Sequence, residues 1–187
     1  MWGWKDVWDS GLKVVKEVKV RIPLKILLVC REIQKHVGHK EFSILARGEW
    51  TTEGFEVSEE YIVPEQEVTS SSVDYKEDLG QYKAQGFNVV IHSHPWGGNT
   101  DFSHTDEETI NTHFDCSILF NGSEFVKAVI SIQINTNIKL QIPAKIEISY
   151  PTISIPAEQI QKIKEKKIEI PITWKKKTKF DDDYLLF

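Results

Sequence analysis

Residues 87–94 read FNVVIHSH, a nearly continuous apolar run that ends in two histidines. An apolar run without alternation is typical of a strand that is buried on both faces, so we expect this one at the centre of a sheet. Residues two apart on a strand point to the same side, so His92 and His94 can converge on one ion where the run ends. The stretch therefore predicts a central strand, with a functional site at the two histidines that end it.

Further strands and helices are expected on both sides of this run. Six stretches have the apolar and β-branched pattern of strands: residues 18–22, 41–50, 55–63, 116–120, 125–134 and 138–150. Residues 24–37 have the spacing of an amphipathic helix, whereas residues 75–85 and 104–113 predict short helices. The polar residues 64–74 predict a loop. The mixture predicts an α+β fold, with a mixed central sheet flanked by helices.

The length of 187 residues is that of one ordinary domain. Three tryptophans distinguish an N-terminal extension, residues 1–17, from a central domain at residues 18–150. Two prolines break the strand pattern after that domain, so residues 151–187 are expected to form a C-terminal extension, with a short helix from Ala157.

Charge and apolar patterning exclude several classes of protein. The net charge of −5 argues against binding to nucleic acid, which needs clustered cationic side chains. Residues 26–30 form the longest apolar run near the N-terminus, which is far too short to span a bilayer, and no signal peptide precedes it. We therefore expect a cytoplasmic protein with no membrane partner. The two cysteines, Cys30 and Cys116, provide neither a disulfide framework nor a thiolate zinc site, and we expect buried free thiols.

A second polar pattern follows the histidine pair. Pro95 and the glycines after it turn the chain, Ser103 suits a helix N-cap, and Asp106 lies three positions further on, in the first helical turn. Two histidines and one carboxylate satisfy three positions of a tetrahedral zinc ion and leave the fourth for water, as in catalytic sites. Singly, each residue has an ordinary explanation, such as a core histidine or a capping pair. Together they favour a metal site.

These residues resemble the signature of the JAMM, or MPN+ (Mov34/PAD-1), zinc metalloprotease family, which is an upstream glutamate, then H-x-H-P, a loop and S-x-x-D. Residues 92–95, Ser103 and Asp106 match it, and EFSILARG at residues 41–48 is similar to the glutamate-led strand of the family. The loop before Ser103 is one residue longer than the usual family spacing. The resemblance implies a single MPN domain of cytidine-deaminase-like fold, in a compact prokaryotic or viral type.

The resemblance also implies a role for each matching residue. His92, His94 and Asp106 would be the zinc ligands, Glu41 the general acid/base, and Ser103 the hydrogen-bond donor to the oxyanion. Because the register of a strand is not certain from sequence, three other carboxylates remain candidates for the base: Glu49, Glu53 and Glu56.

The implied reaction is hydrolysis of an amide or isopeptide bond by a zinc-activated water. Members of the family commonly remove ubiquitin or a ubiquitin-like modifier, so the implied partner is a ubiquitin-like protein or its conjugates. Two alternatives stay open. One is a JAMM peptidase that acts on peptides outside conjugates, in phage tails, cell walls or sulfur-carrier processing. The other is a noncatalytic MPN scaffold.

Overall fold

The computed structural model describes residues 17–94, 100–107, 113–136 and 138–164. The chain divides into two compact units, Met1–Pro151 and Thr152–Phe187. The first unit contains every described strand. The second contributes one described helix, α5 (Ala157–Ile160), which begins at the predicted residue. The predicted tryptophan-rich extension lies outside the described residues, apart from Glu17.

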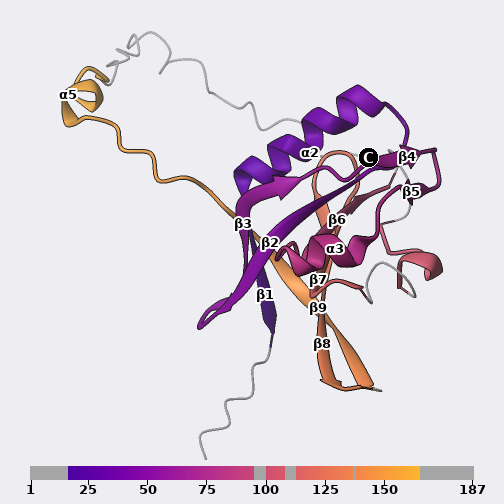
Figure 1. Cartoon of the computed structure of the whole chain (residues 1–187). Coiled ribbons are helices and arrows are strands. Elements are labelled where there is room, and N and C mark those ends of the chain that lie inside the picture. Colours follow the sequence, from indigo (N-terminus) through magenta and orange to yellow (C-terminus); the bar gives the residue numbers. More distant parts are fainter. Residues whose placement is uncertain (1–16, 95–99, 108–112, 137, 165–187) are drawn as a thin grey trace, which may run out of the picture. The chain divides into compact units, whose positions relative to one another are not determined.

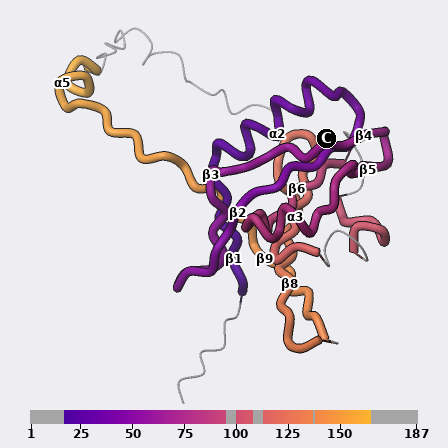
Figure 2. The backbone as a smooth tube through the Cα atoms, viewed as in Figure 1, coloured from indigo at the N-terminus to yellow at the C-terminus, as the bar shows by residue number. Residues whose placement is uncertain are grey.

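Seven strands of the first unit form a closed barrel in the order β1-β3-β2-β6-β7-β8-β9 (Figure 1). Their bounds are β1 (Val18–Pro23), β2 (Ser43–Thr51), β3 (Gly54–Ile62), β6 (Val89–Ser93), β7 (Cys116–Phe120), β8 (Phe125–Asn135) and β9 (Ile138–Ser149). The strand β1 closes the barrel, because it pairs in parallel with β3 on one side and with β9 on the other. The β8–β9 pair extends beyond its neighbours as a long hairpin, which is clear in the backbone trace of Figure 2.

The predicted α+β architecture, with a cytidine-deaminase-like sheet flanked by helices, was wrong. The chain is mostly β, and its main sheet closes on itself. In the part that the structure describes, α2 (Leu24–Val37) is the only helix of more than six residues, and no helix is long and apolar enough to cross a membrane. The error arose because the periodicity of a stretch predicts that it forms a strand, but does not predict which other strand it pairs with. Closure depends on the six residues of β1 meeting residues 144–149.

The local predictions were more accurate than the architecture. The strand β7 and the helix α2 have the predicted bounds, and α2 ends at Gly38. The predicted loop at residues 64–74 was wrong in part, because it contains β4 (Gln66–Val68) and the start of β5 (Val73–Tyr75), which pair as a separate antiparallel sheet. The helix expected next is shortened to α3 (Leu79–Ala84).

The core lies on one face of β2, β6 and β7, and its members include Ile44, Val89, Ile91, Ile118 and Phe120. The helix α2 packs on the same core and supplies the side chains of Ile26, Leu27 and Cys30. Both cysteines are free and buried, as predicted.

The opposite face of these strands carries a second apolar cluster. Leu45 of β2 and Val90 of β6 pack there with Phe87 and Phe114. The strand β6 is therefore buried on both faces, as predicted from its composition. Since side chains alternate along a strand, the polar His92 falls on the same face as Val90 and lies outside the main core.

Gly54, the first residue of β3 after the β2–β3 turn, allows barrel closure to be tested. Gly54 has a φ of +145°, and a Cβ atom there would lie 2.6 Å from the main-chain oxygen of Lys19 in β1. Gly54→Ala should lower the free energy of unfolding by more than about 2 kcal/mol, because a main-chain clash adds to a backbone strain of roughly 1–2 kcal/mol. Urea unfolding followed by circular dichroism measures the change.

Gly38→Ala is the matched control for this experiment. Gly38 also has a positive φ of +69°, but a Cβ atom there would have no neighbour within 4 Å. We expect a loss of roughly 1–3 kcal/mol from backbone strain alone, smaller than that of Gly54→Ala because no main-chain clash adds to it. Equal losses in the two variants would contradict the close approach of this turn to β1.

Candidate metal centre

The candidate site forms where β6 ends beside the entry to β2. Glu41 lies two residues before β2, and its main-chain N–H donates to the carbonyl of Thr69, which joins β4 to β5 (2.8 Å). His92 belongs to β6, and His94 follows directly after it. The N–H of His94 donates to the carbonyl of Phe120 at 2.9 Å, which continues the β6–β7 pairing one residue past the strand. Backbone pairing therefore fixes the positions of all three residues.

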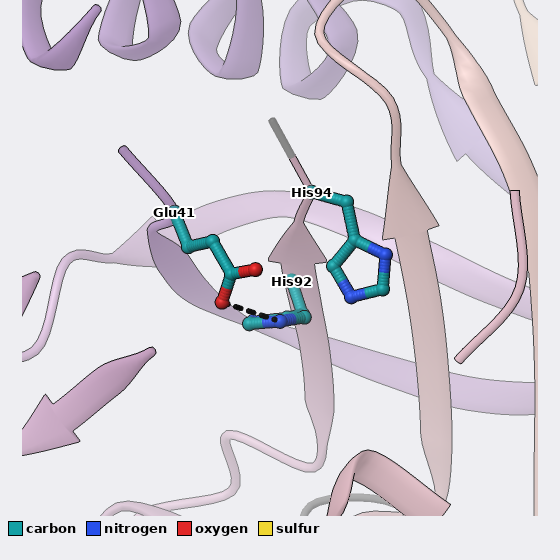
Figure 3. Close-up of side chains that lie close together, drawn as sticks. All are labelled: Glu41, His92 and His94. Atoms are coloured by element: carbon teal, nitrogen blue, oxygen red, sulfur yellow. Dashed lines mark ion pairs between the residues drawn. The ribbon is translucent and has the colours of Figure 1, made fainter. Parts of the chain in front are cut away.

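The side chains of Glu41, His92 and His94 point toward one another in Figure 3. One ligand atom from each residue lies within 4.8 Å of the others, and all three residues are buried. The contact drawn in Figure 3 joins Nε2 of His92 to Oε2 of Glu41, at 3.5 Å. The two imidazole rings are nearly perpendicular, at 89° with centroids 5.1 Å apart. These three residues lie close enough together to bind a metal ion.

Asp106 lies close to both histidines. Its Oδ1 lies 3.5 Å from Nε2 of His92, and its Oδ2 lies 3.2 Å from Nε2 of His94. Ligand atoms at about 2.0–2.1 Å from a tetrahedral zinc ion are roughly 3.3 Å from one another. Each histidine nitrogen is therefore at about this spacing from one oxygen of Asp106, although the two contacts involve different oxygens of that carboxylate.

The protonation states of these groups also suit a metal. Burial lowers the pKa of His92 to about 4, so its ring is neutral and keeps a lone pair for ligation. Burial alone would raise the pKa of Asp106, but its hydrogen-bond contact with His94, the nearness of His92 and two hydrogen bonds from Ser103 lower it to about 2. Asp106 is thus an anion at neutral pH.

Glu41 differs from Asp106 in its electrostatic surroundings. Burial raises the pKa of Glu41, and the neighbouring Asp106 adds to the rise, whereas His94 opposes it. The site therefore holds two carboxyl groups whose proton affinities are shifted in opposite directions. Such a division is typical of sites in which one carboxylate ligates or stabilises and the other transfers protons.

Ser103 is bonded to Asp106 by a reciprocal set of hydrogen bonds. Its hydroxyl and its main-chain N–H both donate to Oδ2 of Asp106, at 2.7 and 2.8 Å, and the N–H of Asp106 donates back to Oγ of Ser103 at 3.2 Å. This is the predicted capping pair, at the start of the helical turn that begins at His104. In this arrangement Ser103 orients Asp106, and its hydroxyl would have to turn away to reach an oxyanion.

The three alternative bases lie elsewhere in the β2–β3 hairpin. Glu49 is paired across the strands with Glu56. Glu53 and Glu56 form ion pairs with Arg21 of β1. The structure therefore brings Glu41, and none of these three carboxylates, to the histidines.

Two residues near the site were missed by the sequence analysis. Oγ of Ser43 lies 3.1 Å from Nδ1 of His92. The hydroxyl of Tyr75 is buried with no hydrogen-bond partner among the described residues, and burial raises the pKa of the phenol to about 12. Ser43 had a weak signal, since it lies two residues after Glu41 at the start of the same strand. Tyr75 had none, because it belongs to a segment that was predicted to be a loop passing into a helix.

Comparison with known proteins does not assign the chain to a family. No protein-family model matches the sequence, and no curated protein matches it. The likeness to JAMM proteases therefore rests on the motif residues alone. The function of this centre has to be argued from its geometry and chemistry.

Proposed function

We propose that the protein is a zinc-dependent peptidase or isopeptidase that hydrolyses amide bonds with a metal-activated water. The observation that supports this most strongly is that His92 and His94 both face Asp106, with one carboxylate oxygen 3.5 Å from Nε2 of His92 and the other 3.2 Å from Nε2 of His94. A second buried carboxyl group, that of Glu41, faces the same point. In this proposal the two histidines and Asp106 are the ligands, and Glu41 is the proton acceptor.

The chemistry of the donor set favours zinc among the common cations. Magnesium and calcium prefer shells of oxygen ligands, whereas two neutral imidazoles with one carboxylate are a frequent catalytic zinc set. Thiolates are not part of this set, because both cysteines are buried in the main core. Three protein ligands leave a position for water, as hydrolysis requires.

Different residues of the chain would have different roles in the hydrolysis. A zinc ion, when bound, supplies Lewis acidity toward a water molecule and the scissile carbonyl. Glu41 accepts a proton from that water and returns it to the leaving amine, a role that its raised pKa favours. Asp106 stays ionised and is held by Ser103. The water attacks directly, so no covalent intermediate with the protein forms.

The substrate that we propose is a ubiquitin-like protein joined to a partner through its C-terminal tail. The sheet of β4 and β5 has no third strand among the described residues, and its connecting Thr69 contacts Glu41. An extended tail could add to this sheet through main-chain hydrogen bonds and lead its final carbonyl to the metal centre. The same chemistry would cut peptides outside conjugates, and mass spectrometry of the products distinguishes these two substrates.

The ligand set is tested by single substitutions and metal analysis. His92→Ala, His94→Ala and Asp106→Asn should each lose most of the bound zinc, because two remaining ligands do not satisfy a site that needs three. Inductively coupled plasma mass spectrometry of the purified proteins measures the zinc content. His36→Ala, at an exposed histidine in the last turn of α2, is the control and should keep its zinc. Full zinc occupancy in either histidine variant would refute the assignment.

Glu41→Gln tests the mechanism separately from the ligands. Glutamine has the shape of glutamate but cannot accept a proton, so zinc content and melting temperature should stay unchanged while turnover falls by about 10²–10⁴-fold. The assay uses a ubiquitin-like protein with a C-terminal fluorophore. The matched control is Glu49→Gln in β2, which should cleave at the wild-type rate. Near-normal cleavage by Glu41→Gln would exclude Glu41 as the base.

A further inference from the structure

We infer that Ser43 is a positioning residue that fixes the tautomer and the ring orientation of His92. The inference deepens the proposed function, since it concerns how one ligand of the same centre is prepared for a metal. Oγ of Ser43 lies 3.1 Å from Nδ1 of His92. Nε2 of the same ring faces Glu41 and Asp106, at 3.5 Å from an oxygen of each. One nitrogen therefore points to the serine and the other to the metal centre.

A neutral imidazole carries one N–H and one lone pair, so the two nitrogens cannot act alike. If Nδ1 donates its proton to Oγ of Ser43, the lone pair is left on Nε2, which is the atom that faces the centre. If the hydroxyl of Ser43 donated to Nδ1 instead, Nε2 would carry the proton and could not ligate. The direction of this one hydrogen bond therefore decides whether His92 is ready to bind a metal.

The surroundings of Ser43 favour a hydrogen bond in which Nδ1 of His92 donates to Oγ of Ser43. Ser43 is fully buried and His92 is 4% exposed, so bulk water does not replace either partner. Oγ of Ser43, at 3.1 Å, is within hydrogen-bond distance of Nδ1, whereas the carboxylate oxygens that face Nε2 lie 3.5 Å away, beyond the usual length of such a bond. A proton on Nδ1 therefore has an acceptor at hydrogen-bond distance, and a proton on Nε2 does not.

The position of Ser43 is itself held from two sides. Ser43 and His92 are paired residues in the β2–β6 ladder. On the other side of β2, the amide of Gln66 contacts both main-chain polar groups of Ser43. Oε1 of Gln66 accepts from the N–H of Ser43 at 2.9 Å, and Nε2 donates to the carbonyl at 2.8 Å. Gln66 takes the place that a neighbouring strand would occupy, so Ser43 cannot withdraw from His92 without losing these bonds.

The tautomer can be measured directly in the metal-free protein. Long-range ¹H–¹⁵N correlation spectra of protein labelled at histidine distinguish Nδ1–H from Nε2–H, and the His92→Gln variant identifies the signals of His92. We expect the Nδ1–H form in the wild type and a shift toward Nε2–H in Ser43→Ala. A wild-type ring in the Nε2–H form, or an unchanged tautomer in Ser43→Ala, would overturn the inference. The wild-type spectrum decides this even if the variant does not fold.

Zinc affinity provides the second measurement. Loss of a partner that orients a ligand typically weakens metal binding by about 10–100-fold, so we expect this loss in Ser43→Ala by competition with a chelating dye. Ser43→Thr keeps the hydroxyl and should recover most of the affinity. The control is Ser117→Ala, which removes a buried hydroxyl of β7 that has no hydrogen-bond partner among the described residues. Equal weakening in Ser43→Ala and Ser117→Ala would show a general packing effect and contradict the inference.

These outcomes separate the inference from the function on which it rests. If the wild-type protein binds no zinc, the proposed enzyme is wrong, but the tautomer of His92 in the metal-free protein still tests the role of Ser43. If zinc binds and the substrate is cleaved while Ser43→Ala keeps both the tautomer and the affinity, the proposed enzyme stands and the role of Ser43 is wrong.

Discussion

Burial of β6 on both faces is the constraint on which the site depends. One face of the strand belongs to the main core and the other to the Leu45 cluster, so a polar side chain at its end has little access to water. A buried polar group without a hydrogen-bond partner costs roughly 1–3 kcal/mol. Nδ1 of His92 avoids that cost through its hydrogen bond with Ser43, and Nε2 faces the two carboxyl groups of the site at 3.5 Å. The network around the site is therefore a requirement of folding as well as of chemistry.

The two carboxyl groups share one buried site but differ in their neighbours. Asp106 accepts two hydrogen bonds from Ser103 and lies against both histidines, which stabilises its anion. Glu41 has fewer such partners, and burial dominates its pKa. The hydrogen bonds that stabilise the Asp106 anion are those of a helix cap. Ser103 and Asp106 would form them at this helical turn whether or not a metal bound. The fold thus produces one permanent anion and one proton acceptor from ordinary local structure.

The features that depend on the local pattern of residues could be predicted from the sequence. The apolar run before His92 predicted a strand buried on both faces, and the end of α2 followed from Gly38. His92, His94, Ser103 and Asp106 were found because their spacing is fixed by one strand end and one helix start, whereas Glu41 was assigned from the resemblance to the JAMM signature. Barrel closure could not be predicted, because the partners of β1 are set by long-range packing. Gln66 was missed for the same reason: its contact with Ser43 spans 23 residues.

The parallel pairing of β1 with β9 has a consequence for biosynthesis. Residues 18–23 cannot find their partners at residues 144–149 until nearly the whole first unit has emerged from the ribosome. Contacts between such distant residues slow folding, and unpaired strand edges invite association with other chains. During translation β1 can pair early with β3, but its other edge stays open until β9 arrives. The nascent chain therefore has a long interval in which a chaperone that covers the open edge of β1 would increase its yield.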